Sequence, residues 1–261
     1  MRAQSKRTVW LLPLLLVVVG VLLLLDNFLL LDVDLTPYWP WLLVLAGLQV
    51  LVKGDIAPSW QAHSFGITRG SVRSGTLEIE SGEIDVQIRA LRKPGRLIAG
   101  QYTARSRPSL NVRNNHATLQ LQRGQTWWLS MADWDLGLAS DLPWGLLASS
   151  SIGNLDVDLR GLVLERAVIA SGMGTVTAVA PDRASGPIFL RSTLGDVRVA
   201  VPEDMPATII VKAGPFARVR VDSRRYEEIS ENRYVTRDPG NTLQGALEIT
   251  VSTVFGTIHV N

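Results

Sequence analysis

The chain has 261 residues, of which 46% are hydrophobic and 19% charged, enough apolar material for one or two folded domains. Its formal charge is only +2, so no strong positive field attracts a polyanion, and a nucleic-acid partner is not expected. The absence of cysteine excludes disulfides, thiolate nucleophiles and sulfur-ligated metals.

Two long apolar runs stand near the start of the chain. The first covers about residues 9–25, contains no charged residue and follows Lys6 and Arg7; the second covers about residues 35–52. At 1.5 Å per residue these runs are about 25 and 27 Å long, close to the thickness of the hydrocarbon core of a bilayer. We therefore expect residues 1–53 to form a transmembrane α-hairpin, with the lipid bilayer as a partner.

A cleaved signal peptide is the competing interpretation of the first run. It is disfavoured because the run is longer than a usual signal core, no small-x-small cleavage motif follows, and a second apolar run does. Basic residues flank the pair of runs, whereas Asp26, Asp32 and Asp34 lie between them. The positive-inside rule then predicts a cell-membrane protein with two spanning helices, whose termini and following domain are cytoplasmic. If the second run only lies in the interface, that domain faces outward.

The rest of the chain has the pattern of an all-β domain. Residues 54–63 contain the Gly, Asp, Pro and Ser of a linker, and residues 64–261 contain short segments of alternating apolar and polar residues separated by turn residues. No window has a convincing helical period. The segment Tyr226–Glu231 is at most one helical turn.

A repeat of about 21 residues is clearest from residue 153 onward. Each copy begins with glycine, and apolar residues then follow at alternate positions. Successive copies start 21, 21, 19 and 42 residues apart, at Gly153, Gly174, Gly195, Gly214 and Gly256. Glycine allows a sharp corner, and one such unit cannot bury its apolar face alone, so neighbouring units must stack. We expect a β-solenoid or similar stack of strands, with a β-sandwich as the alternative.

Two groups of residues are weak candidates for interaction. The first group could form an aromatic platform for a lipid, glycan or protein, or else a core layer that plugs the end of the stack. It consists of Trp127, Trp128, Trp134 and Trp144. The second group could meet an anionic membrane surface or an acidic partner. It consists of Arg218, Arg220, Arg224 and Arg225.

Motifs for catalysis or cofactor binding do not emerge from the sequence. There is no G-x-S-x-G or S-x-x-K nucleophile motif. Gly172-Met173-Gly174 begins like a dinucleotide fingerprint, but Thr177 occupies the third glycine position. His63, His116 and His259 are far apart in sequence, and none has metal-ligand spacing. We therefore predict a non-enzymatic protein with no catalytic, cofactor-binding or metal-binding residues and no cofactor.

A family resemblance covers nearly the whole chain. The segments LLLVVVGVLLLLDNFLLLDVD and YWPWLLVLAGLQVLVKG resemble the two-helix membrane module of bacterial LiaF-like proteins. From about Ser64 the chain resembles the β-rich toastrack domain that accompanies this module, through LDVDLRGLVLERAVIASGMGTV and TLGDVRVAVPEDMPATIIVKAGPFARVRV. The copy at Gly214 departs from the pattern because it lacks the usual acidic residue after glycine.

The resemblance implies a role in sensing or regulating the bacterial cell-envelope stress response through protein contacts of the β-domain. A membrane sensor kinase, another envelope protein or a second copy joined through β edges are the partners it suggests. The alternative is an outward-facing structural or glycan-binding β-solenoid anchored in the membrane. A polysaccharide-cleaving β-helix enzyme ranks last, because the sequence offers no evident carboxylate cluster with a basic or metal-binding partner.

Overall fold

The computed structural model describes residues 63–91, 94–102, 108–123, 133–237 and 246–261. The chain divides into two compact units, Met1–Lys53 and Gly54–Asn261, and all described residues belong to the second. The predicted transmembrane hairpin and most of the predicted linker therefore lie outside the described residues. Within the described ranges, no helix has the length and hydrophobicity needed to cross a membrane.

All regular elements of the described residues are β-strands, in agreement with the predicted all-β domain. The strands are β1 (His63–Thr68), β2 (Ser74–Glu80), β3 (Val86–Ala90), β4 (Arg96–Tyr102), β5 (Ser109–Arg113), β6 (His116–Gln122), β7 (Trp134–Leu138), β8 (Pro143–Ile152), β9 (Leu155–Asp158), β10 (Val163–Met173), β11 (Val176–Val179), β12 (Arg183–Ala184), β13 (Ile188–Leu194), β14 (Val197–Ala200), β15 (Ala207–Val221), β16 (Tyr226–Ser230), β17 (Arg233–Thr236) and β18 (Leu247–Val260). The segment expected to be at most a helical turn is thus mostly the strand β16.

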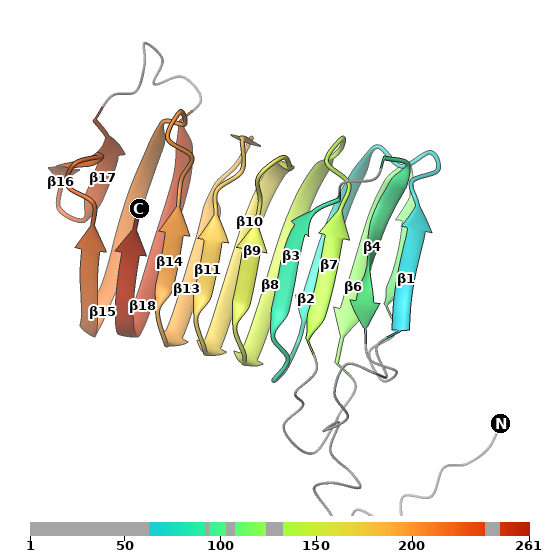
Figure 1. Ribbon diagram of the computed structural model, residues 1–261, viewed down its shortest axis with the longest axis horizontal. Coiled ribbons are helices and arrows are strands. Elements are labelled where there is room, and N and C mark those ends of the chain that lie inside the picture. Colours follow the sequence, from blue (N-terminus) through green and yellow to red (C-terminus); the bar gives the residue numbers. More distant parts are fainter. Residues whose placement is uncertain (1–62, 92–93, 103–107, 124–132, 238–245) are drawn as a thin grey trace, which may run out of the picture. The chain divides into compact units, whose positions relative to one another are not determined.

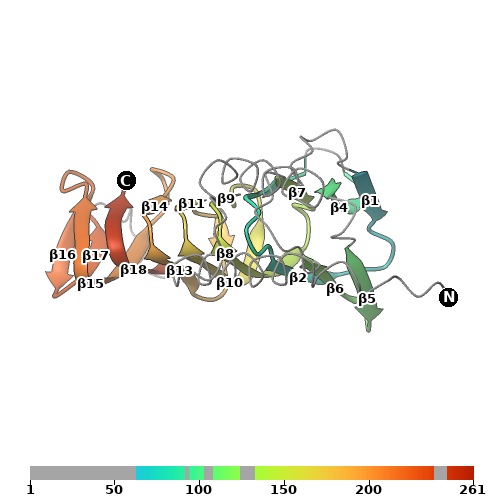
Figure 2. The same cartoon turned by 90° about the horizontal axis from the view of Figure 1, so that it is seen from below.

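The strands form two ladders that face each other across the core (Figures 1 and 2). The first ladder has the order β5-β6-β2-β8-β10-β13-β18-β15-β17-β16. The second has the order β1-β4-β7-β3-β9-β11-β14-β18-β15. From β6 to β15 and from β7 to β15 the pairing is parallel. Each coil of the chain thus supplies one strand to each ladder, which is the stacked arrangement predicted from the repeat.

Alternation along each strand fills the space between the ladders with apolar side chains. In β14 the buried Val197 and Val199 alternate with Arg198 and Ala200, which face outward. In register with Val197 are Val176 of the preceding coil and Ile258 of β18, and neither side chain is accessible to solvent. One coil therefore buries its apolar row only through the coils on either side of it.

A glycine opens the second-ladder strand of most central coils, and its geometry explains the repeat. Gly174, Gly195 and Gly256 have φ values of 147°, 153° and 138°, which disfavour residues with a side chain. A Cβ atom at Gly174 would lie 2.2 Å from the carbonyl oxygen of Gly153, and one at Gly195 would lie 2.2 Å from that of Gly174. The coils therefore approach each other too closely at this edge for any other residue.

A buried hydroxyl three residues before each of these glycines holds the corner together. The hydroxyl groups of Ser171 and Ser192 donate to the carbonyl oxygens of Gly153 and Gly174 at 2.9 and 2.8 Å. The Thr253 hydroxyl donates to the carbonyl oxygen of Gly195 at 2.9 Å. Each bond joins one coil to its neighbour. A Ser/Thr-x-x-Gly pattern is thus the local sequence of this edge, which we call the glycine edge.

The order of the coils differs from the order of the sequence at the C-terminal end. β18 lies between β14 and β15, so the coil of Gly256 stacks directly on the coil of Gly195 (Figure 1). The 42 residues from Gly214 to Gly256 equal twice the repeat length, but they do not correspond to two successive coils along the stack. Opposite Gly256 in register is Ala217, whereas Gly214 lies at a register shift between Ala213 and Phe216.

Antiparallel strands cover most of both ends of the stack. β4 and β5 pair with the outermost parallel strands β7 and β6, and β1 pairs with β4. At the other end, β17 pairs with the first part of β15, and β16 pairs with β17. Such end strands limit the unpaired edge that a parallel stack would otherwise present.

Candidate functional site

Five exposed apolar side chains line up along the glycine edge, one on each of five successive coils. We call them the corner row, and their exposed fractions are 45% for Ile152, 46% for Met173, 50% for Leu194, 43% for Phe255 and 67% for Phe216. Each is in register with the next one along the stack. The rings of Phe216 and Phe255 stack with centroids 4.8 Å apart and planes 6° from parallel. Larger exposed apolar patches are the kind of surface through which proteins associate with other proteins or with membranes.

A second apolar row runs along the outer side of the first ladder. Val168 and Phe189 are in register and exposed, and Leu147 and Ile210 continue the row as half-buried residues. Thr250 of β18 lies between Phe189 and Ile210. We call this the face row. Because the ladder beneath it is hydrogen-bonded on both sides, the row is held on a rigid sheet.

Basic side chains flank the corner row. Arg191 and Lys212 are exposed on the first ladder, three and four residues before Leu194 and Phe216 respectively, and Arg218 follows Phe216 on the second. Asp196 is the carboxylate closest in sequence to Leu194, and it accepts the Thr257 backbone N–H at 2.9 Å and a bond from Arg198 at 3.3 Å. These two donors, the Thr257 amide first, hold the pKa of Asp196 below its usual value. The carboxylate is therefore already engaged within the domain.

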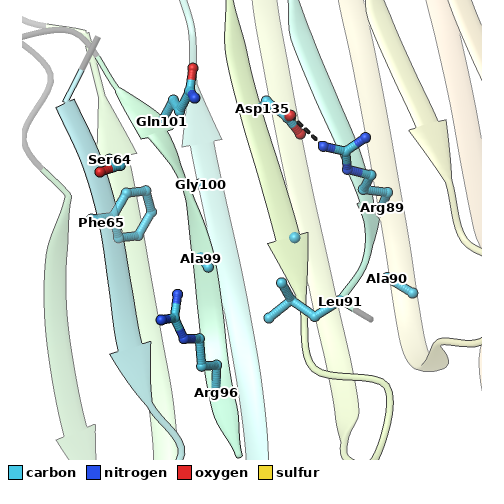
Figure 3. A pocket seen from close by; sticks show the side chains of 11 residues that line it. Ser64, Phe65, Arg89, Ala90, Leu91, Arg96, Ala99, Gly100, Gln101 and Asp135 are labelled. Carbon is cyan, nitrogen blue, oxygen red and sulfur yellow. Dashed lines mark hydrogen bonds and ion pairs between the residues drawn. The ribbon is translucent and has the colours of Figure 1, made fainter. Parts of the chain in front are cut away.

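A shallow groove of about 490 Å³ lies on the outer side of the second ladder near the N-terminal end (Figure 3). Gly100 and Gly137 contribute no side chain to it, and Leu91 packs over Gly137. Arg89 Nη2 lies 2.5 Å from the Asp135 carboxylate, and the Arg96 guanidinium lies close to Gly66. The groove thus has a mixed apolar and polar lining, in which Arg89 is paired with Asp135 and Arg96 is the second cation. No nucleophile is positioned by a base among its lining residues.

A smaller cavity of about 330 Å³ lies at the C-terminal end of the stack. Val219 and Val221 of β15 line it together with Tyr226 and Tyr234 of the terminal hairpin. Burial, together with the neighbouring Glu228, raises the pKa of Tyr234. The second half of β15 has β18 on one side and no pairing on the other within the described residues.

The predicted tryptophans have different places. Trp134 and Trp144 are fully buried, and Trp144 Nε1 donates to the carbonyl of Ala139 at 2.8 Å. The Trp144 ring packs over Gly75, where a Cβ atom would lie 2.5 Å from it. These two rings belong to the core and do not form a surface platform. Trp127 and Trp128 lie outside the described residues.

The predicted arginines do not form one cluster. Arg218 and Arg220 are exposed on β15, and Arg220 is in register with His259. Arg224 is exposed in the following turn, where its backbone N–H donates to Asp222. Arg225 instead donates to the Pro202 carbonyl and lies 5.4 Å from the centre of the Tyr226 ring. Only Arg218 and Arg220 therefore share a strand at the surface.

Metal-binding chemistry has no site among the described residues, where no group of three His, Asp or Glu side chains lies close enough to hold an ion. His116 is hydrogen-bonded to the hydroxyls of Ser74 and Thr76 at 2.7 and 2.9 Å. His259 lies on the outer side of the second ladder, beside Arg198 and Arg220. The side chain of His63 is outside the described set.

The corner row was missed in the sequence, although a signal for it exists. An apolar residue stands directly before the glycine of four repeat copies, in Ile152-Gly153, Met173-Gly174, Leu194-Gly195 and Phe255-Gly256. In each of these copies the residue directly before the glycine is exposed, so an apolar residue at that position joins the surface row. The fifth member, Phe216, stands before Ala217 and follows no such rule.

No protein-family model and no curated protein sequence matches the chain. A solved structure of a candidate cell adhesion protein from Clostridium sporogenes matches with a TM-score of 0.67 at 15% identity, over 76% of this chain and 97% of that chain. The two share the fold. Candidate adhesins from Bacteroides fragilis (TM-score 0.23, 10% identity, 78% of this chain and 99% of that chain) and Parabacteroides merdae (0.22, 9%, 77% and 97%) also match. Scores that low support no argument.

Proposed function

We propose that the chain is a non-enzymatic, membrane-anchored protein of the bacterial cell-envelope stress response, which senses or regulates through contacts of its β-domain. The observation that carries this proposal is the pair of exposed apolar rows held in register on rigid ladders. Such rows suit association with another surface, because a rigid sheet loses little conformational entropy when it is covered. Their side chains include no acid, base or nucleophile.

Two parts of the proposal, the membrane anchoring and the role in the stress response, are supported by the sequence. The two apolar runs in residues 1–53 have the length of spanning helices. The stress response is what the resemblance to LiaF-like proteins implies. A protein partner would meet the face row, where Val168 and Phe189 are exposed side by side.

The test compares variants in a strain that lacks the chain and carries a cell-envelope stress reporter. Three proteins are returned to this strain: wild type, the double variant Val168→Ser and Phe189→Ser, and a control, Val179→Ser. The control makes a single Val-to-Ser change at a half-buried position on the outer side of the second ladder. We expect wild type and Val179→Ser to restore the reporter level and the double variant to fail, at equal amounts in the membrane.

Two results would contradict the proposal in different ways. A reporter that does not respond to loss of the chain would refute the role in the stress response. A reporter restored equally by all three proteins would refute contact through the face row.

An outward-facing glycan-binding protein is the second candidate, and the groove of Figure 3 favours it. Arg96 there has no ion pair among the described residues, so its guanidinium is available to a carboxylated or phosphorylated sugar polymer. Retention of the full chain on anionic cell-wall polymer is expected to fall at least severalfold in Arg96→Ala if this candidate is correct. Equal retention of wild type and variant would eliminate it.

A further inference from the structure

The corner row is an apolar line at the surface, and its five members are 43% to 67% exposed. Strands in a sheet lie about 4.8 Å apart, so five successive coils extend the row over roughly 19 Å. Phe216, its most exposed member, stacks on Phe255 and extends the apolar line to the last coil of the stack. The row is therefore a narrow apolar ridge and has no concave shape that would enclose a small ligand.

The chain enters the domain at this same edge. β1 is antiparallel to β4, and β4 is antiparallel to β7, so β1 runs in the same direction as β7, β3, β9, β11 and β14. The second-ladder strands of this group begin directly after the glycine edge, and β1 therefore begins there too (Figure 1).

The opposite edge of the stack has a different surface. None of the exposed large apolar residues among the described ranges lies in its turns at 159–162, 180–187 and 201–206. Those turns instead expose charged side chains of both signs, at Asp182, Glu203 and Asp204 and at Arg160 and Arg183. One edge is thus apolar with basic neighbours, and the other is polar with charges of both signs.

We propose that the corner row rests on the lipid bilayer, with Leu194, Phe255 and Phe216 at the level of the headgroups and upper acyl chains. Arg191, Lys212 and Arg218 then face anionic headgroups, which attract basic side chains next to an apolar surface. The contact is confined to the coils of the row, because Asp85 and Asp133 lie at the same edge on the coils beyond it. This inference rests on the membrane anchoring in the proposed function.

A second copy of the chain is a less suitable occupant. A two-fold contact between two corner rows would bring the basic side chains of both copies to one boundary, where like charges repel. A bilayer with anionic lipids has the opposite charge. Its surface is also long enough to cover all five side chains at once.

The test uses the full chain, whose lack of cysteine allows single labels. Leu194→Cys on the corner row and Ser185→Cys on the opposite edge are each labelled with an environment-sensitive fluorophore. Both proteins are reconstituted into vesicles of equal parts phosphatidylcholine and phosphatidylglycerol, with nitroxide-bearing lipid in both leaflets. We expect quenching at position 194 to be about twofold or more that at 185, because an interfacial apolar face sits within the headgroup boundary.

A charge variant tests the electrostatic part in the same vesicles. Arg191→Glu with Lys212→Glu, placed in the Leu194→Cys background, is expected to reduce quenching at position 194 toward that at 185. These exposed side chains have no ion pair among the described residues, so the domain is expected to remain folded. Unchanged quenching in this variant would overturn the role of the basic residues.

Each remaining outcome has a separate meaning. Equal quenching at positions 194 and 185 in chain that floats with the vesicles would overturn the lipid contact and leave the anchoring intact. Protection of position 194 that depends on protein density and not on nitroxide would assign the row to a second copy and also overturn it. Chain that does not float with vesicles would refute the anchoring, and with it both proposals.

Discussion

The two edges of the coil stack turn the chain by different means. At the glycine edge, Gly174, Gly195 and Gly256 each lie against a carbonyl of the neighbouring coil, and a hydroxyl bonds that same carbonyl. At the opposite edge, the turns at 159–162, 180–187 and 201–206 differ in length. The comparison teaches that one edge fixes the spacing of the coils, while the other accommodates extra residues.

The largest expected effect comes from breaking the glycine edge. Gly195→Ala places a Cβ atom 2.2 Å from the Gly174 carbonyl oxygen at a φ of 153°. Backbone strain and overpacking together are expected to lower the free energy of unfolding by about 3 to 5 kcal/mol. Thermal and denaturant unfolding of the full chain in detergent, followed by the β-sheet signal in far-ultraviolet circular dichroism, measures this loss.

A glycine of the opposite edge provides the control. Gly161 also has a positive φ of 73°, but among the described residues the only atom within 4 Å of its added Cβ is the Ala90 Cβ at 3.8 Å. Gly161→Asn is therefore expected to cost less than about 1 kcal/mol, since asparagine tolerates this backbone region. Equal losses at Gly195 and Gly161 would contradict the difference between the two edges.

The next effect concerns the buried hydroxyls. Ser192→Ala removes the 2.8 Å bond to the Gly174 carbonyl, and the loss is expected to be about 1 to 2 kcal/mol. Ser192→Thr is the matched control, because Thr253 makes the equivalent bond on the next coil. The same unfolding measurement applies. If Ser192→Thr were as damaging as Ser192→Ala, the hydroxyl would not be the stabilising group.

The glycine corners were predictable from the sequence, because the residue pattern that marks them is local. Gly153, Gly174 and Gly195 follow a hydroxyl residue by three positions and recur every 21 residues, so pattern reading finds them without knowledge of pairing. The alternation of buried and exposed residues likewise predicts the strands. The same local pattern also locates four members of the corner row, because the residue directly before each corner glycine is apolar and exposed.

The order of the coils at the C-terminal end was not predictable in this way. The position of β18 between β14 and β15 depends on contacts between residues far apart in sequence. The spacing of the repeats does not specify such contacts. Gly214 fits the repeat pattern in the sequence but does not take the position of a corner glycine in the structure. In its coil, the residue opposite Gly256 is Ala217. For the tryptophans the sequence left open both a surface platform and a core layer. Trp134 and Trp144 are core residues, and their burial depends on the whole fold.

A smaller expected effect is the pH dependence of stability, which differs between the glycine edge and the opposite edge. Asp196 accepts the Thr257 backbone N–H of the neighbouring coil, and this bond, with Arg198, lowers its pKa. A lowered pKa in the folded state means that stability is present above the unfolded pKa and is lost as pH falls through the folded value. Because Asp196 is about one third exposed, solvent screens the effect, and the loss on acidification is expected to stay below about 1 kcal/mol.

The control for this measurement is an asparagine in place of Asp196. Asn154 shows that an asparagine fits such a position, because its side-chain oxygen accepts the Thr175 backbone N–H at 2.9 Å in the same way. Asp196→Asn should keep the bond between coils and flatten the acid limb of the stability curve. On the opposite edge, Asp158 is paired with Arg160 of its own turn, which lowers the pKa of Asp158 without joining two coils. Acid-induced weakening that is unchanged in Asp196→Asn would show that another carboxylate is responsible.

The smallest effect on stability is expected in the corner row itself. Met173→Ser and Leu194→Ser alter side chains that are 46% and 50% exposed, so each should change the free energy of unfolding by no more than about 0.5 kcal/mol. The matched core change Val197→Ser, in the same coil as Leu194, leaves an unpaired hydroxyl among buried side chains and should cost about 2 kcal/mol or more. A large loss in Leu194→Ser would mean that the row serves packing of the stack, because a residue kept for association contributes little to the isolated fold.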